Sequence, residues 1–268
     1  MIYNLALFKK AGITKVPTTL KELVDVCKQL SAAGITPIAM AAGDSGWPQF
    51  LLYHLTAQNV AADSNDKIMT GKATFSDDKG WQTTLDYYQQ LIPYFMPNPV
   101  GATEEAAKAG FLQGTVAMFP SVFFIPKARD AGLEVGYFGF PGSDTADSQR
   151  IWGGYPVQIG INPKNGRTKL AEAFLDFLYS SDFYTGFVSM LSSYPVIDGT
   201  KITESDPLSP TLQADWKGKT LVASPADTWL PGVQDAMLAS VQELTAGRIS
   251  TADVLAAMDK ATANALKK

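Results

Sequence analysis

The residues of this sequence best suited to chemistry are aromatic rings that stand beside glycine, proline, serine or aspartate. Sugar rings have apolar C–H faces that lie flat on aromatic planes, and a rim of hydroxyl groups that needs carboxylate, amide or backbone partners. An aromatic ring near an acidic side chain therefore suits a carbohydrate site. The rings in question are Trp47, Phe123, Phe124, Trp152, Tyr155 and Trp229.

Two of these rings stand where a ligand is most easily reached. The loop GDSGWPQF places Asp44 and Trp47 directly after a short apolar run, and ligands of α/β sheets usually bind at the carboxyl ends of strands. Trp152 is followed by Gly153 and Gly154, which let a backbone bend and a ligand approach closely. We expect both tryptophans to line a cleft, whereas core packing explains any other single ring at least as well.

Other chemistries fit the sequence poorly. His54 is the single histidine and Cys27 the single cysteine, so neither a Ser/His/Asp triad nor a zinc site can be built. No GxxxxGK[ST] loop occurs. Glycoside hydrolysis needs only two carboxyl groups, but the adjacent acids Asp77–Asp78 and Glu104–Glu105 stand where helices begin, which the helix dipole explains. We expect binding without catalysis, and neither cofactor nor metal.

Composition narrows the classes further. A net charge of −4 with scattered lysines and arginines offers no surface for a phosphate backbone, so we expect no nucleic-acid partner. No apolar run approaches the roughly 20 residues that span a bilayer. The length of 268 residues suits one large or two modest domains. The sequence does not open on a secretory leader, which indicates either a cytoplasmic protein or a beginning that has been removed.

Patterns of short strands and longer helices alternate along the chain, as in the α/β class. Thr19 and Glu22 form a capping box before a helix over residues 20–33, in which Cys27 should be buried and inert. The stretch RIWGGYPVQIGIN, residues 150–162, alternates apolar with small or polar residues and predicts one half-buried strand. Further helices are expected from about residue 48 and over 79–91, 103–113, 168–178, 182–191 and 251–266. Strands are expected over 35–41, 115–119, 135–140 and 194–197. Residues 63–75 form a polar segment.

Four stretches in order give the sequence a family resemblance. They are IYNLALFKKAGI, GITPIAMAAGDSGWP, FLQGTVAMFPS and WGGYPVQIGINP. Together they resemble the extracellular solute-binding proteins of the maltose-binding-protein type, family 1. The sequence departs from the family pattern at Leu5, where lysine is usual, at Leu20, where tryptophan is common, and at residues 119–121, where a Gly-Ser-Trp-like run is frequent.

The resemblance implies an α/β, periplasmic-binding-protein-like fold of type II, with two lobes, hinge crossovers and an incomplete N-terminal lobe. Residues 1–152 would form the core of the C-terminal lobe, residues 153–195 a returning segment of the N-terminal lobe, and residues 196–268 the mostly helical completion of the C-terminal lobe. An apolar sheet face without its partner strands favours association. We therefore expect the apolar residues of the returning segment to meet something outside this sequence or to lie exposed.

The same resemblance implies a carbohydrate-binding component of an ABC-type importer, which closes on its ligand and presents it to permease subunits. A complementary N-terminal fragment is a further expected partner, and the expected location is periplasmic or extracellular, with a lipoprotein anchor conceivable. The alternatives are a ligand-sensing protein for a membrane receptor and a glycoside-active enzyme. The expected ligand contacts are Asp44, Trp47, Ser121, Phe123, Trp152, Gly153, Gly154, Tyr155, Asp227 and Trp229.

Overall fold

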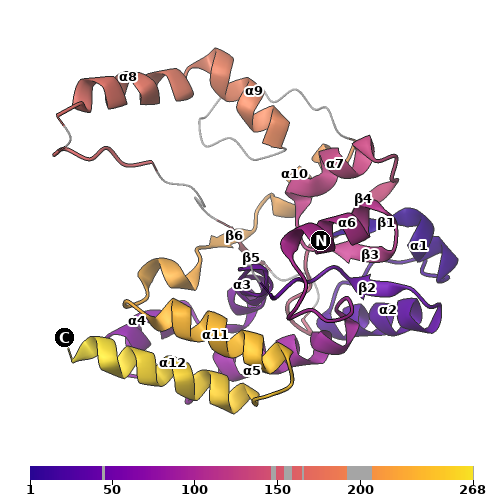
Figure 1. Ribbon diagram of the computed structural model, residues 1–268, viewed down its shortest axis with the longest axis horizontal. Coiled ribbons are helices and arrows are strands. Elements are labelled where there is room, and N and C mark those ends of the chain that lie inside the picture. Colours follow the sequence, from indigo (N-terminus) through magenta and orange to yellow (C-terminus); the bar gives the residue numbers. More distant parts are fainter. Residues whose placement is uncertain (44–45, 146–148, 154–158, 165, 192–206, 268) are drawn as a thin grey trace.

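The body of the protein is built around a small mixed sheet (Figure 1). The computed structural model describes residues 1–43, 46–145, 149–153, 159–164, 166–191 and 207–267. Strands β1 (Ile2–Asn4), β2 (Thr36–Ile38), β3 (Val116–Phe119) and β4 (Val135–Tyr137) form a four-stranded sheet in the order β2-β3-β1-β4. Strands β2 and β3 run parallel, whereas β1 is antiparallel to β3 and β4. The α/β class is confirmed.

A second, two-stranded sheet joins segments that lie far apart in the sequence. Strand β5 (Arg150–Trp152) pairs in parallel with β6 (Thr220–Val222), and β5 lies along helix α3. The helices are α1 (Leu5–Lys10), α2 (Leu20–Ala32), α3 (Trp47–Asn59), α4 (Ser64–Met69), α5 (Lys79–Leu91), α6 (Glu104–Leu112), α7 (Ile125–Asp130), α8 (Thr168–Leu178), α9 (Ser181–Leu191), α10 (Ser209–Trp216), α11 (Val233–Thr245) and α12 (Thr251–Leu266), with single 3-10 turns η1 (Ile92–Tyr94), η2 (Val122–Phe124) and η3 (Pro225–Thr228).

Most predicted helices are confirmed to within two residues, and the strands are shorter than predicted. The polar segment over 63–75 contains α4, which begins after Asp63 at its N-cap position. The placement of Trp47 was wrong. Trp47 does not stand in a loop but opens α3, where Pro48 occupies one of the first two helical positions that proline favours.

The predicted strand over 150–162 is confirmed at residues 150–152 and is wrong at residue 153 and at residues 159–162. Strand β5 ends at Trp152, and its ladder with β6 is followed by a bond from the Gly153 N–H to the Val222 carbonyl, 3.0 Å. Residues 159–162 are not in a strand, and Ile159 is 49% exposed. Residues 154–158 and the strand predicted over 194–197 lie outside the described residues.

The core forms where the helices turn their apolar stripes toward the sheet. On α5, Trp81, Leu85 and Tyr88 repeat at helical spacing and are fully buried, and α11 and α12 pack on the same side. Cys27 is buried as predicted, and burial raises the pKa of its thiol. The opposite face of the sheet carries a second cluster around Phe119, so the four strands lie between two hydrophobic layers.

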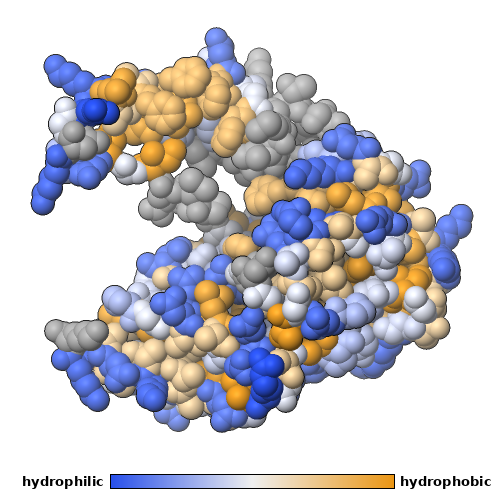
Figure 2. Space-filling model, viewed as in Figure 1, coloured by the Kyte–Doolittle hydropathy of each residue, from blue (hydrophilic) through white to orange (hydrophobic). Residues whose placement is uncertain are grey.

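Helices α8 and α9 stand apart from this body as an arm (Figure 1). Apolar side chains gather along the arm, as Figure 2 shows. Five of its exposed apolar side chains are Leu170, Phe174, Phe177, Phe183 and Phe187, which are 37–67% exposed. Large apolar side chains gathered and exposed in this way mark an interaction surface. Among the described residues, no helix is long and apolar enough to cross a membrane.

One buried hydroxyl in the core predicts a stabilising substitution. Thr84 is fully buried and its Oγ1 has no hydrogen-bond partner among the described residues. An unpaired buried hydroxyl costs about 1–3 kcal/mol, so Thr84→Val should raise the free energy of unfolding, by about 0.5–1 kcal/mol. Urea unfolding followed by circular dichroism measures this change.

Thr245 provides the matched control. Its hydroxyl lies 2.8 Å from the Tyr88 hydroxyl and donates to the Val241 carbonyl at 2.7 Å. The same exchange, Thr245→Val, removes these bonds and should lower stability by about 1–2 kcal/mol. If both valine variants shift stability in the same direction, the assignment of an unpaired hydroxyl to Thr84 is wrong.

Candidate functional site

A continuous wall of aromatic rings connects α3 with β5. The Phe50 ring lies 5.8 Å from the Trp47 ring and 5.4 Å from the Trp152 ring, measured between centroids. Trp152 also contacts Tyr53 at 5.7 Å and His54 at 5.1 Å. All three rings of the wall are half-buried. Half-buried rings that share one surface offer flat apolar faces to a ligand.

Local structure explains why these rings meet. Trp47 is the first residue of α3 and Phe50 follows three positions later, so both lie on one face of the helix. Trp152 ends β5 beside the same helix. The buried Phe119 of β3 packs against Trp47 and supports it, with the two ring centroids 5.2 Å apart. The wall therefore lies where the start of α3 meets the end of β5, and the end of β3 supports it.

The polar edge of each tryptophan is engaged by a protein acceptor. The Trp152 indole Nε1 donates to Ser224 Oγ at 3.0 Å. Bonds from Lys108 and from the Trp47 side chain to the Glu104 carboxylate lower the pKa of Glu104. The Lys108 Nζ lies 2.6 Å from Glu104 Oε1. The polar group of each indole thus has an acceptor within the protein.

Amide and carboxylate groups flank the wall. Gln49 Oε1 accepts from Gln234 Nε2 at 2.9 Å and from the Tyr53 hydroxyl at 3.4 Å. Burial and the charge of Asp227 raise the pKa of Tyr53 to about 12, so the phenol stays protonated and can donate. Among the described residues, the Gln49 NH₂ group and the Gln234 carbonyl oxygen have no hydrogen-bond partner of their own. Together with the exposed Asp227, these groups suit the hydroxyl rim of a sugar.

The residues expected from the sequence fall into three groups. Trp47 and Trp152 meet in the wall, and Asp227 lies close enough to Tyr53 to act on its pKa. Ser121 and Phe123 follow the end of β3 at Phe119; Ser121 is half-buried and Phe123 is 56% exposed. Asp44, Gly154 and Tyr155 lie outside the described residues.

Two expected ligand contacts make other contacts instead. The half-buried Trp229 ring lies 5.6 Å from the Trp81 ring and 5.7 Å from the Phe75 ring, and so packs against buried core residues. Gly153 does allow a close approach, but the neighbour is a side chain of the protein: a Cβ at this position would lie 2.9 Å from Leu221 Cδ2.

Sequence reasoning missed several residues of the site. Phe50 and Tyr53 follow Trp47 at positions i+3 and i+6, so they would have been found once Trp47 was placed on a helix. Gln234 and Ser224 come from segments distant in sequence, and no local pattern marks them. Among the described residues, no cluster of histidine, cysteine, aspartate and glutamate could hold a metal ion.

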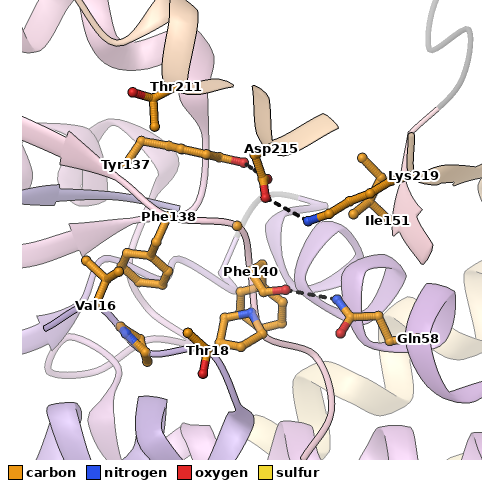
Figure 3. Close-up of a pocket in the computed structure, with 13 residues that line it drawn as sticks. Val16, Thr18, Gln58, Tyr137, Phe138, Phe140, Ile151, Thr211, Asp215 and Lys219 are labelled. Atoms are coloured by element: carbon orange, nitrogen blue, oxygen red, sulfur yellow. Dashed lines mark hydrogen bonds and ion pairs between the residues drawn. The ribbon is translucent and has the colours of Figure 1, made fainter. Parts of the chain in front are cut away.

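A separate pocket of about 210 Å³ lies beside β5 (Figure 3). Ile151 lines this pocket while the next residue, Trp152, belongs to the wall, and successive strand residues point to opposite faces. Asp215 accepts from the Tyr137 hydroxyl at 2.6 Å and from Lys219 at 2.7 Å, and Gln58 donates to the Phe140 carbonyl at 2.9 Å. Because these polar groups already have protein partners, we centre the candidate site on the aromatic wall.

The histidine beside the wall predicts a loss of stability in acid. Burial lowers the pKa of His54 from 6.5 to about 3. The unfolded chain takes up a proton as the pH falls below about 6.5 and the folded state does not, so stability is lost from about pH 6.5 downward. The ring is half-buried rather than fully enclosed, so we expect a loss of about 1–2 kcal/mol between pH 7 and pH 4.5.

Urea unfolding at the two pH values measures this loss, and His54→Gln is the comparison because the chain has no other histidine. The glutamine variant should lose less stability over the same interval. An equal loss in both proteins would show that other groups carry the acid sensitivity.

This chain resembles known proteins in sequence and in fold. A family model described as bacterial extracellular solute-binding protein matches residues 1–183. A multiple sugar-binding protein of Streptococcus mutans is 25% identical over 230 residues, which cover 82% of this chain and 54% of that protein. The chain thus spans about half the length of this curated relative.

Solved structures share the fold at low identity. A chitin oligosaccharide binding protein has a TM-score of 0.86 at 22% identity, over 100% of this chain and 69% of its own. A family 1 extracellular solute-binding protein from Bifidobacterium longum subsp. infantis has a TM-score of 0.73 at 22% identity, over 98% and 70%. These matches confirm the periplasmic-binding-protein-like fold. With the family model matched over more than half of its length, the chain belongs to the bacterial extracellular solute-binding proteins.

Proposed function

We propose that this chain is the carbohydrate-binding part of a solute-binding protein that serves an ABC-type importer. The observation that carries the proposal is the wall of Trp47, Phe50 and Trp152, flanked by amide and carboxylate groups. Aromatic faces receive the C–H faces of sugars and the flanking groups receive the hydroxyls. The multiple sugar-binding protein and the chitin oligosaccharide binding protein, which this chain resembles, bind ligands of this class by name.

The proposed mechanism is binding alone, without catalysis. A sugar that contacts both sides of a cleft favours the closed form, and a permease that binds only the closed form then receives the ligand. The family description places such proteins outside the cytoplasm, and we propose a periplasmic or extracellular location, held at the membrane by a lipid anchor.

A thermal-shift screen of the full-length gene product tests the ligand class. A ligand that binds only the native state stabilises it by RT ln(1 + [L]/Kd), about 2.7 kcal/mol at a hundredfold excess over Kd. Mono- and oligosaccharides are expected to raise the melting temperature. If amino acids or polyamines raise it and no sugar does, the carbohydrate assignment is wrong.

We further propose that a complementary part of the family architecture covers the arm. Part of the length of each relative has no counterpart in its match to this chain. The arm meanwhile leaves Phe174 at 55% and Phe177 at 54% exposed, and the two rings follow each other at helical spacing. An N-terminal portion of the lobe, in the same chain or in a second one, would bury this face.

The exposed arm predicts self-association of the 28.8 kDa chain when it is studied by itself. The variant Leu170→Glu/Phe174→Glu should shift the chain toward monomer, because a charge on an apolar face opposes its burial. Sedimentation velocity measures the distribution. Phe123→Glu is the control, because Phe123 is also exposed but lies on the body. A monodisperse, stable monomer with the native arm would contradict the proposal.

A further inference from the structure

The wall tryptophans share a feature that their role as stacking surfaces does not require. Each has its only polar atom, the indole N–H, bonded to a side chain outside the wall. Trp152 donates to Ser224, and Trp47 donates to Glu104. Outside the wall, Trp229 donates its indole N–H to Asn65 Oδ1 at 3.5 Å, whereas the indole nitrogen of Trp81 is buried with no partner among the described residues. A bonded N–H is therefore common, though not universal, among the tryptophans of this protein.

We propose that Glu104 and Ser224 are positioning residues that hold the two indole planes in a ligand-ready orientation before any ligand arrives. The proposal rests on the proposed function only where it says that the fixed orientation serves the binding of a sugar. The bonds themselves can be tested without a ligand.

Contacts within α6 hold the Glu104 carboxylate that accepts from Trp47. It is the first residue of α6, where the helix dipole favours a negative charge. Lys108, one turn further along, holds the Glu104 carboxylate at 2.6 Å and also contacts Glu105 at 2.8 Å. The result is a chain of contacts from Lys108 through Glu104 to Trp47. Glu105 shares the lysine but has an 83% exposed side chain, which makes it a matched neighbour.

Ser224 is placed to act on Trp152. It stands at the N-cap position of η3, where a serine hydroxyl often bonds the backbone, but it makes no such capping bond among the described residues. Its oxygen instead accepts the indole N–H of Trp152, 72 positions away in sequence. The parallel pairing of Trp152 with Val222 brings the two residues together.

This arrangement determines how a ligand can be recognised. Because both indole N–H groups are engaged, the tryptophans present faces rather than hydrogen-bond donors. Hydroxyl groups of the ligand must then bond elsewhere, and Gln49 and Gln234 have the free amide groups to do so. Fixing a ring before binding avoids the cost of immobilising it on binding. Most of the resulting gain in affinity should lie in slower dissociation.

The ligand-free test is the set of indole N–H signals in a ¹H–¹⁵N NMR spectrum, which should hold five tryptophan peaks. Glu104→Ala should move the Trp47 peak upfield and speed its exchange with solvent. Ser224→Ala should do the same to the Trp152 peak. The Trp81 peak is the internal reference and should not move. Unchanged Trp47 and Trp152 peaks in these variants would overturn the proposal.

The binding test uses the sugar found by thermal shift and measures Kd and the dissociation rate. Glu104→Ala and Ser224→Ala should each weaken binding by about three- to tenfold, since an immobilised side chain costs that much affinity. Glu104→Gln keeps an acceptor oxygen for the indole and should restore most of the affinity. Glu105→Ala and Ser240→Ala are the controls, and neither should change Kd; Ser240 bonds the Ala236 carbonyl within α11.

The two proposals fail in different ways. If no sugar binds the native protein, the proposed function is wrong, and the indole signals alone decide whether Glu104 and Ser224 position the rings. If sugar binds and Glu105→Ala weakens it as much as Glu104→Ala, the effect comes from Lys108 or from general loosening, and the positioning role is overturned.

Discussion

Replacing Trp152 by alanine should weaken sugar binding by about thirtyfold, which corresponds to about 2 kcal/mol and is typical of a central tryptophan in a binding surface. The Trp152 ring has the most ring contacts in the wall, since it contacts Phe50, Tyr53 and His54. Its loss removes the stacking face at this end of the wall and leaves the other rings without lateral support. Isothermal titration calorimetry with the sugar identified by thermal shift measures the change.

Trp152→Phe is the informative comparison. It keeps an aromatic face but loses the N–H that bonds Ser224, so it should weaken binding less than the alanine variant does, by about the same three- to tenfold as Ser224→Ala. Both variants need to be measured well below their melting temperatures, because Trp152 also packs against the main core. An alanine variant that binds with native affinity would remove Trp152 from the site.

Replacing Phe119 by alanine should lower the free energy of unfolding by about 3–5 kcal/mol, as deletion of a buried phenylalanine usually does. Phe119 is 1% exposed, and its ring contacts Phe124 at 4.7 Å and Phe111 at 5.6 Å. Phe119 also packs against Trp47. The alanine variant should therefore bind sugar more weakly at temperatures where the variant remains folded. Denaturant unfolding and calorimetry report the two effects separately.

Phe123→Ala is the matched control for stability. It removes the same ring four positions later, at a residue that is 56% exposed, and should change stability by less than about 0.5 kcal/mol. Equal losses at the two positions would mean that the ring cluster around Phe119 does not carry the stability of this face of the sheet.

Elements with a strong local signal were predictable from the sequence. The helix over 79–91 was predicted with the bounds that the structure shows, because Asp78 caps it and its apolar residues repeat at helical spacing. The strand over 150–162 was not predictable in its length. Its alternation suggested a long ladder, but a strand extends only as far as a partner strand accompanies it, and β6 accompanies three residues.

The candidate site shows the same limit. Trp47 and Trp152 were predicted because they stand beside loop-forming residues, and the structure places both in the aromatic wall. Trp229 stands beside such residues too, and yet it packs against the buried Trp81, since a flanking sequence does not report which way a ring points. Gln234 was missed because its relation to Gln49 exists only in three dimensions, across 185 positions of sequence.

The pairing of β5 with β6 has a consequence for the order in which the protein is made. Trp152 and Ser224 are 72 positions apart, and synthesis at about 5–20 residues per second separates their emergence by roughly 4–14 seconds. During that interval Trp152 has neither its strand partner nor its acceptor, so the aromatic wall cannot be complete. A nascent chain stalled before residue 220 should therefore fold its first helices and sheet and still lack a complete form of the proposed sugar site.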